Sequence, residues 1–504
     1  MHRHGRGVRV VLVTVTLVAV GGCAVGPNYK RPPVITPEAY KELDGWKVAE
    51  PGDLTLRGAW WELFGDPTLN ELESRVSAAN QTLVAAEATY RQATALVREA
   101  RAGFFPTVTI GAGYTRSQVS TTITSSGTNA NATAAALTGG VATSTTGRPT
   151  NFFQLPIDVT WTPDFWSRVR RTVESNQAAA QASSGDLDTA RLSLQAELAQ
   201  DYFQMRTLDA QRKLLDESVK AFEQSLELTR TRFRGGVASQ VDVVQAETQL
   251  ETTRAQAIDV GVQRAQLEHA IAVIIGQPAS ALALPAAPLT APPPIVPIGI
   301  PSQLLERRPD IAAAERRMAA ANAQIGVALA AFYPTITLSA SGGFESSSIA
   351  RWLTWPSRFF AVGPSIQQTV IDGGLRRAQT DQARAAYDTG VANYRETVLT
   401  AFQGVEDNLA ALRILESEAD VQERAVRAAR RSVELTTTQY RAGIVSYLNV
   451  ITTQTIALAN DVTAVQILGR RMTATVLLIQ ALGGGWNAAD LPSAAAVTER
   501  ARER

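Results

Sequence analysis

The chain has 504 residues and carries 48 Lys and Arg against 47 Asp and Glu, a formal net charge of +1 at pH 7. This near balance argues against a nucleic-acid partner, because nucleic-acid-binding proteins normally carry a basic excess. One cysteine excludes an intramolecular disulfide and a metal site built from several cysteines. With 45% hydrophobic residues the chain has enough apolar material to fold, and its length alone would suit about three soluble domains.

Residues 1–22 have the pattern of a secretory signal peptide. Arginines precede an apolar run, 10–20, that is too short to span a bilayer, which takes about 20 residues. Val20-Gly-Gly-Cys resembles the bacterial lipobox, in which small residues precede the cysteine that receives lipid. We predict cleavage before Cys23 and its conversion to an N-palmitoyl, S-diacylglycerol cysteine; the alternative is an ordinary signal peptide with a chance cysteine. Ala24, in place of an aspartate that would resemble an inner-membrane retention signal, favours the outer membrane.

Two landmark motifs occur twice along the chain, in the same order. The motif ARAGFFPTVTI at 100–110 recurs as ALAAFYPTITL at 328–338, an offset of 228 residues. The motif RFRGGVAS at 232–239 recurs as QYRAGIVS at 439–446, an offset of 207 residues. The difference of 21 residues matches a longer Ser/Thr/Gly/Ala tract, 117–150, in the first half. The chain is therefore predicted to consist of two structural repeats.

Both repeats predict the same series of elements. The first, 68–275, has a helix, a β-hairpin at 104–162 and a long helical hairpin with its tip near 235–242. The second, 302–483, has a helix, a β-hairpin at 332–370 and a helical hairpin with its tip near 443–449. The expected helices are 68–102, 167–234 and 240–275 in the first repeat and 302–331, 375–441 and 446–482 in the second. The other segments are a lipidated N-terminal segment, a Pro-rich linker that cannot continue a helix and a C-terminal tail: 23–67, 276–301 and 484–504.

The helices and the hairpin strands have different hydrophobic periods. From Leu187 to Phe233, apolar residues recur at intervals of three, four or seven, the seam of a coiled coil. The strands alternate apolar residues with small or polar ones, as a water-lined barrel in lipid requires, and a strand of a soluble β-sandwich would show the same alternation. Aromatic residues cluster at the strand ends, which fits the aromatic girdles of a membrane barrel. Because four strands cannot close a barrel and open edges are not tolerated in lipid, a spanning chain must oligomerise. Two copies would give 8 strands and three would give 12.

Enzyme motifs are absent from the sequence. His269 is the only histidine left after removal of the signal peptide, so a Ser-His-Asp set or a His/Cys metal cluster is not expected. There is no phosphate-binding loop, no zinc-protease motif and no C-x-x-C pair. We predict no catalytic residue, no metal site and no enzymatic activity.

Several motifs resemble those of the outer membrane factor lipoproteins, the TolC-like exit ducts of efflux pumps. Residues 24–32 (AVGPNYKRP) resemble the start of their mature chains, and 60–69 (WWELFGDPTL) resemble the next block. The most specific match is LLERRPDI at 304–311, which continues to Phe332-Tyr333-Pro334. The resemblance covers essentially the whole mature chain.

The resemblance implies an α+β membrane protein with two internal repeats. It would be a homotrimer, with a coiled-coil α-barrel of long helices crossing the periplasm and a transmembrane β-barrel of four strands per protomer. The implied partners are a periplasmic adaptor (membrane fusion) protein, an inner-membrane pump of the RND type and outer-membrane lipid. The implied function is passive conduction of small molecules; the alternatives are the exit duct of a type I protein secretion system or a periplasmic coiled-coil structural lipoprotein without a pore.

In this family the turns of the helical hairpins are the periplasmic tips, which close the duct and meet the adaptor. The implied tip and gate residues are Gly235, Gly236, Ser239, Asp242, Tyr440, Arg441, Gly443, Ser446, Asn449 and Thr452. Glycine permits the sharp reversal between long helices. The family often places aspartates just inside the tips to attract cations; Asp242 fits this, but Asn449 and Thr452 stand where acids are common, so a dense carboxylate ring is not expected. Tyr440 and Arg441 are expected to form hydrogen bonds or ion pairs that hold the closed state.

Overall fold

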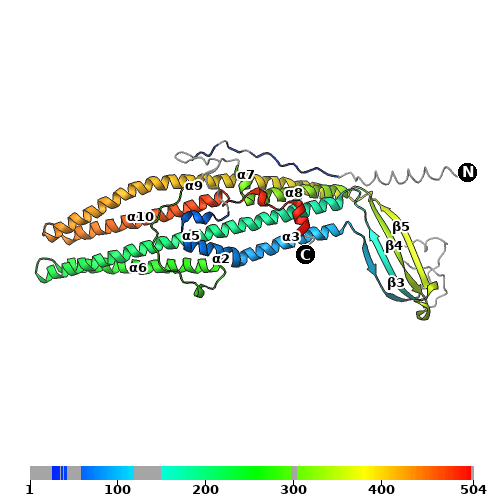
Figure 1. The fold of residues 1–504 in the computed structure, drawn as a ribbon, viewed down its shortest axis with the longest axis horizontal. Coiled ribbons are helices and arrows are strands. Elements are labelled where there is room, and N and C mark those ends of the chain that lie inside the picture. Colours follow the sequence, from blue (N-terminus) through cyan, green and yellow to red (C-terminus); the bar gives the residue numbers. More distant parts are fainter. Residues whose placement is uncertain are drawn as a thin grey trace. The chain divides into compact units, whose positions relative to one another are not determined.

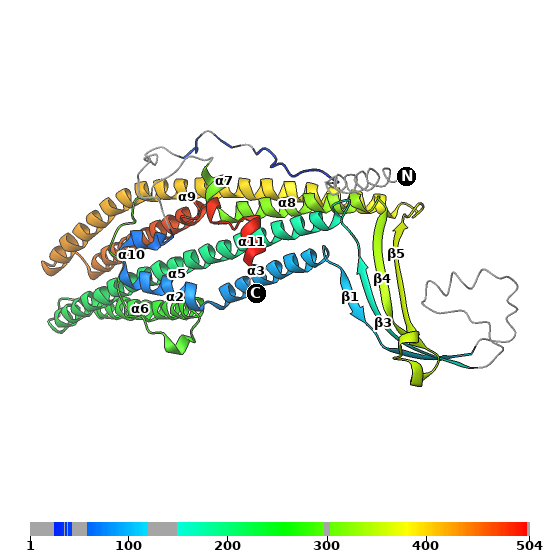
Figure 2. The same cartoon turned by 45° about the vertical axis from the view of Figure 1, so that its right-hand side comes forward.

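The computed structural model describes residues 25–34, 36–37, 39–42, 58–118, 149–296 and 303–500. The predicted signal peptide and Cys23 lie outside these residues, so their processing stays a prediction. The chain divides into two compact units, each built from both repeats (Figures 1 and 2). The strand unit comprises Met1–Asn28, Arg98–Ser175 and Asn322–Ala385, and the helical unit comprises Tyr29–Val97, Asn176–Ala321 and Ala386–Arg504.

Two long helical hairpins make up most of the helical unit. Helices α5 (Arg168–Arg234) and α9 (Leu375–Arg441) have 67 residues each, and α6 (Gln240–Ile274) and α10 (Tyr447–Ala481) have 35 each. The equal lengths agree with an internal repeat. Along α5, most of the predicted coiled-coil seam is buried, but its last member, Phe233, is 42% exposed.

The first helix of each repeat is broken, which corrects the single helices expected at 68–102 and 302–331. Helices α2 (Pro67–Ala79) and α3 (Gln81–Ala102) are separated by Asn80, and α7 (Leu304–Arg307) and α8 (Pro309–Ala330) by Arg308. Asn80 is extended, accepts a hydrogen bond from Leu83 N at its Oδ1 and donates from Nδ2 to Ile274 O at 2.7 Å. Arg308 is extended because the proline that follows it disfavours the helical conformation.

Short elements complete the described chain. In the helical unit they are η1 (Trp60–Phe64), η2 (Ala279–Ala281), η6 (Ala488–Asp490) and α11 (Ala494–Arg500); in the strand unit they are η4 (Ile349–Arg351) and η5 (Trp355–Ser357). Trp60 of η1 is buried in the core of the helical unit with Tyr202 and Tyr394. Asp66 caps α2 with one carboxylate oxygen and accepts from Tyr202 Oη at 2.6 Å with the other, so the N-terminal block is fixed to α5.

Buried charges attach the Pro-rich linker to the first helical hairpin. Arg206 donates to Pro285 O at 2.7 Å, and Arg264 donates to Leu284 O at 2.6 Å. The two arginines share Asp209, whose carboxylate lies 3.3 Å from Arg206 Nη1 and 2.7 Å from Arg264 Nε. The linker thus has fixed partners on α5 and α6 although it forms little regular structure.

Among the described residues, α10 alone is long and apolar enough, by length and composition, to cross a membrane. Its apolar side chains include Val476, Leu478 and Ile479, which are buried in the core of the helical unit. Asp461 in the same helix pairs with Arg430 of α9 at 2.8 Å. These contacts are those of a core helix packed against protein.

The strand unit contains one antiparallel sheet. Its strands are β1 (Thr107–Ile110), β2 (Gly113–Ser117), β3 (Thr150–Trp161), β4 (Thr335–Ser346) and β5 (Arg358–Gln367). The order is β1-β3-β4-β5, and β2 also pairs with β3. Each repeat supplies one β-hairpin, and the two hairpins join through β3 and β4. Because β1 and β2 both pair with β3, one after the other, the sheet is four strands wide. Among the described strands, the outer edges of β1, β2 and β5 have no partner strand.

The first strand of the hairpin expected at 104–162 is interrupted between Ile110 and Gly113, which corrects the continuous alternation predicted for the strands. Ile110 pairs with Ile157 and Gly113 with Gln154, so the register does not slip across the gap. The gap faces Pro156, which has no N–H to donate to the neighbouring strand. Exposed apolar side chains remain on the outer strands, with Phe360 86% and Val362 78% exposed, as expected of a lipid-facing surface.

Candidate functional site at the tips of the helical hairpins

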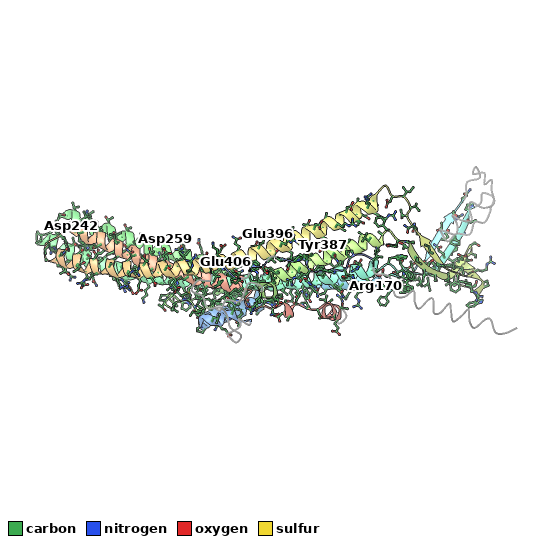
Figure 3. All side chains as sticks on the ribbon, turned by 90° about the horizontal axis from the view of Figure 1, so that it is seen from above. Arg170, Asp242, Asp259, Tyr387, Glu396 and Glu406 are labelled. Carbon is green, nitrogen blue, oxygen red and sulfur yellow. The ribbon has the colours of Figure 1, made fainter. Side chains whose placement is uncertain are left out.

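The first tip is a tight glycine turn closed by a capping box. Gly236 has φ +75°, a left-handed conformation that favours glycine, and Arg232 O accepts from Val237 N at 2.8 Å. Ser239 is the N-cap of α6, and its hydroxyl accepts from Asp242 N at 3.2 Å. The Asp242 carboxylate in turn accepts from Ser239 N at 2.9 Å. Asp242, labelled at the end of the hairpin in Figure 3, therefore terminates the turn and also complements the positive end of α6.

The second tip has the same turn but a weaker cap. Gly443 has φ +78°, and Ser446 is the N-cap of α10 but makes no side-chain cap hydrogen bond. Asn449 occupies the place that Asp242 has in the first repeat, and its N–H donates to Ser446 O at 3.2 Å. Thr452 Oγ1 donates to Leu448 O within the helix at 2.9 Å. The second tip therefore lacks both the carboxylate that Asp242 supplies in the first tip and the capping hydrogen bond that this carboxylate makes.

The two tips lie side by side (Figure 1). They contact each other through Arg232 and Tyr440. The Arg232 guanidinium carbon lies 4.7 Å from the centre of the Tyr440 ring, and Nη1 donates to Arg441 O at 3.1 Å. Tyr440 is 4% exposed, and its hydroxyl lies 3.5 Å from Thr229 Oγ1. Arg441 therefore joins the two tips by accepting a hydrogen bond at its main-chain carbonyl.

A tyrosine pair and an apolar cluster extend this contact along the hairpins. The Tyr440 and Tyr447 rings lie 5.4 Å apart, and Tyr447 Oη donates to Ser225 Oγ at 3.3 Å. Burial raises the pKa of Tyr447, so its hydroxyl stays protonated and can donate. The cluster contains apolar residues from both hairpins: Phe222, Leu226, Val243, Ala246, Leu250 and Val450.

Exposed charged pairs link the two helices of the first hairpin. Arg254 of α6 lies 2.5 Å from Glu223 of α5, and Arg230 of α5 pairs with Glu247 of α6. These side chains are all more than 40% exposed, so each pair contributes little to stability. Because these pairs lie within the first hairpin, the contact between the two hairpins depends on the buried residues around Tyr440 and Tyr447.

Sequence reasoning located both turns but missed Arg232, Thr229 and Ser225, which meet the second hairpin. One signal was available: the repeated motif begins with Arg232 in the first repeat but with Gln439 in the second. A charged residue at one of two matching positions marks a difference between the tips. Its partner could not be deduced, because Arg232 and Tyr440 are 208 residues apart in the sequence.

The comparisons with known proteins agree with this architecture. A family model described as outer membrane efflux protein matches residues 72–277 and 300–484. The probable efflux pump outer membrane protein TtgC of Pseudomonas putida is 30% identical over 484 residues, covering 94% of this chain and 95% of that protein. The pyoverdine export outer membrane protein OpmQ of Pseudomonas aeruginosa is 31% identical over 468 residues, covering 93% and 95%.

Solved structures show the same fold. The outer-membrane channel OprN aligns with a TM-score of 0.82 at 29% identity over 92% of this chain and 100% of that one. The CmeC outer membrane channel of Campylobacter jejuni aligns with a TM-score of 0.84 at 20% identity, over 95% and 98%. The predicted fold class, an α-barrel joined to a β-barrel, and the predicted outer-membrane location are thereby confirmed. The chain belongs to the outer membrane efflux protein family.

Proposed function

We propose that this chain is the outer-membrane exit duct of a tripartite efflux pump and conducts small molecules passively from the periplasm to the exterior. One observation carries the proposal: a sheet whose two edges have no partner among the described strands is combined with two long helical hairpins in a chain of the efflux protein family. Its relatives are named as efflux or export outer membrane proteins, which favours efflux over a protein-secretion duct. A structural coiled coil without a pore does not account for the sheet. The family is one of channels, and no catalytic step is proposed.

Three copies would complete the duct. Each chain contributes a sheet that is four strands wide, so a homotrimer would close a twelve-stranded barrel and leave no edge in lipid. An adaptor protein would meet the hairpin tips and connect the duct to an inner-membrane pump of the RND type. Cys23 would carry the lipid anchor. The tips would open when the hairpins separate, a two-state change biased by partner binding.

Reconstitution tests the proposal directly. The purified full chain in planar bilayers is expected to give discrete single-channel current steps, and to run on gels as a trimer that heating converts to a monomer. A strain that lacks the gene should become more sensitive to toxic small molecules, and sensitivity should be restored to normal by the wild-type gene. A folded trimer without current steps would rule out the channel function.

Asp242 is expected to contribute to cation preference. In the Asp242→Asn variant the ratio of cation to anion permeability should fall, because one carboxylate per chain is lost near the mouth of the duct. Since Asp242 also caps α6, Ser239→Ala serves as the matched control: it removes the hydroxyl of the cap and keeps the charge. Reversal potentials measured in a salt gradient give the ratio. If the permeability ratio fell equally in both variants, the cap, and not the charge, would determine the cation preference.

A further inference from the structure

The first described residues of the chain are bound in the strand unit by a buried arginine. Arg171, in the first turn of α5, is 5% exposed. It donates from Nε to Val25 O at 3.2 Å, and from Nη2 to Gly26 O at 3.3 Å and to Asn28 Oδ1 at 3.0 Å. Its remaining nitrogen, Nη1, pairs with Glu174 at 2.8 Å. Three of the four hydrogen bonds of this buried charge are therefore made to the start of the chain.

Helix α8 supplies the other side of the same site. Asn322, also 5% exposed, donates from Nδ2 to Pro27 O at 3.1 Å. Gly326 lies one turn further along the same face of α8. A Cβ on Gly326 would lie 2.9 Å from Arg171 Cγ, so a side chain there would displace the arginine.

Close packing of two glycine backbones fixes the position of the segment. Gly26 has φ +98°, and a Cβ on it would lie 2.5 Å from Gly326 Cα. Any other residue at Gly26 would both strain the backbone and separate the segment from α8. Side chains from two repeats and backbone contact thus recognise four consecutive residues, Val25 to Asn28.

We propose that Arg171, Asn322 and Gly326 form a seat that fixes the start of the mature chain, and with it the lipid on Cys23, at the junction of helices and strands. The inference rests on the proposed lipidation of Cys23. Cys23 lies two positions before Val25, which limits the distance between the lipid-bearing residue and Val25 to about 7 Å. The acyl chains of each protomer therefore enter the membrane at a fixed place. The lipid is held at a defined position on the protein and is not connected to it by a long flexible segment.

The position of the seat along the chain places this point beside the strands. Arg171 follows the end of β3, at Trp161, by ten residues, and Gly326 precedes the start of β4, at Thr335, by nine. Both seat helices pass directly into the sheet in the strand unit. A lipid held there lies at the end of the sheet that adjoins the helices, where acyl chains can enter the periplasmic leaflet of the outer membrane.

A spin label at residue 24 tests the seat in the full-length lipoprotein. The Ala24→Cys variant offers the only free thiol, because the Cys23 thiol is occupied by lipid. In liposomes of phosphatidylethanolamine and phosphatidylglycerol, the label is expected to show one immobilised spectral component. Gly26→Ala and Arg171→Gln should each add a mobile component, and trypsin cleavage after Lys30 should accelerate about tenfold as local opening increases.

Gly58→Ala is the matched control, because Gly58 has a similar left-handed φ of +71° but no atom of the described residues lies within 4 Å of the added Cβ. It should leave both the label and the cleavage rate unchanged. If the label had the same mobility in the wild-type background and in both seat variants, the proposed seat would be wrong. A mass for the N-terminal peptide that lacks the lipid would overturn the proposal at its premise. Single-channel current, measured on the same preparations, is expected to persist, and it reports separately on the proposed channel function.

Discussion

Replacing Arg232 with alanine is expected to raise the open probability of the reconstituted channel about tenfold. The substitution removes the cation–π contact with Tyr440 and the hydrogen bond to Arg441 O, which join the two hairpin tips. Together such contacts contribute on the order of 1.5 kcal/mol to the state in which the tips touch, and about 1.4 kcal/mol corresponds to a tenfold change in an equilibrium. Single-channel recordings at fixed voltage measure the ratio of open to closed time.

Arg234→Ala is the control for this experiment. Arg234 lies two residues away at the end of the same helix, and its hydrogen bonds go to Glu227 and Thr231 of its own helix. Its removal changes the charge of the tip by the same amount but leaves the contact with the second hairpin in place. Arg232→Lys should fall between the two, because lysine keeps the charge but lacks the planar guanidinium. Equal open probabilities for the alanine variants of Arg232 and Arg234 would contradict a role for the Tyr440 contact.

Glu73 is expected to make the stability of the protein fall as the pH rises. Its side chain is fully buried in α2, and among the described residues neither carboxylate oxygen has a hydrogen-bond partner. Burial raises the pKa of Glu73 from 4.5 to about 9. Between these values the folded state holds a proton that the unfolded state releases, so the free energy of unfolding decreases with increasing pH. Within this pH range, each pH unit lowers the free energy of unfolding by up to about 1.4 kcal/mol, which amounts to about 3 kcal/mol between pH 5 and pH 7.5.

The Glu73→Gln variant should remove this dependence. Glutamine has the shape of the protonated acid and does not titrate, so the variant should match the wild type near pH 5 and be more stable near pH 8. The difference appears as a few degrees in melting temperature, measured in detergent at both pH values. Glu71→Gln is the matched control, because the Glu71 side chain is 63% exposed on the same helix. If the melting temperatures of the wild type and Glu73→Gln changed with pH in the same way, another group would have to stabilise the Glu73 side chain in the folded state.

The long helices and the turns between them follow from local sequence patterns. A hydrophobic seam with a period near 3.5 residues and the glycine turns predict α5, α6, α9 and α10 to within a residue or so at most ends. Gly236 and Gly443 are recognisable because a left-handed turn residue is a local requirement. The internal repeat and the alternation of the strands likewise need no knowledge of the partner segments.

Interruptions inside an element depend on what lies opposite. Asn80 ends α2 because its amide reaches Ile274 O on α6, almost two hundred residues away in the sequence. The gap between β1 and β2 reflects Pro156 on the neighbouring strand. Only the break at Arg308 had a local signal, the proline that follows it, because proline restricts the residue before it.

The sequence by itself determined the two repeats, the glycine turns at both tips, the coiled-coil seam and the resemblance to outer membrane factors. These are periodic or local features, and the chain carries them in neighbouring residues. Only the tertiary structure decided which residues join the tips, that Arg171 binds the segment from Val25 to Asn28, and that Glu73 is enclosed without a hydrogen-bond partner among the described residues. Each of these depends on packing between segments distant in the sequence, where desolvation and hydrogen-bond geometry, rather than residue type, set the role of a side chain.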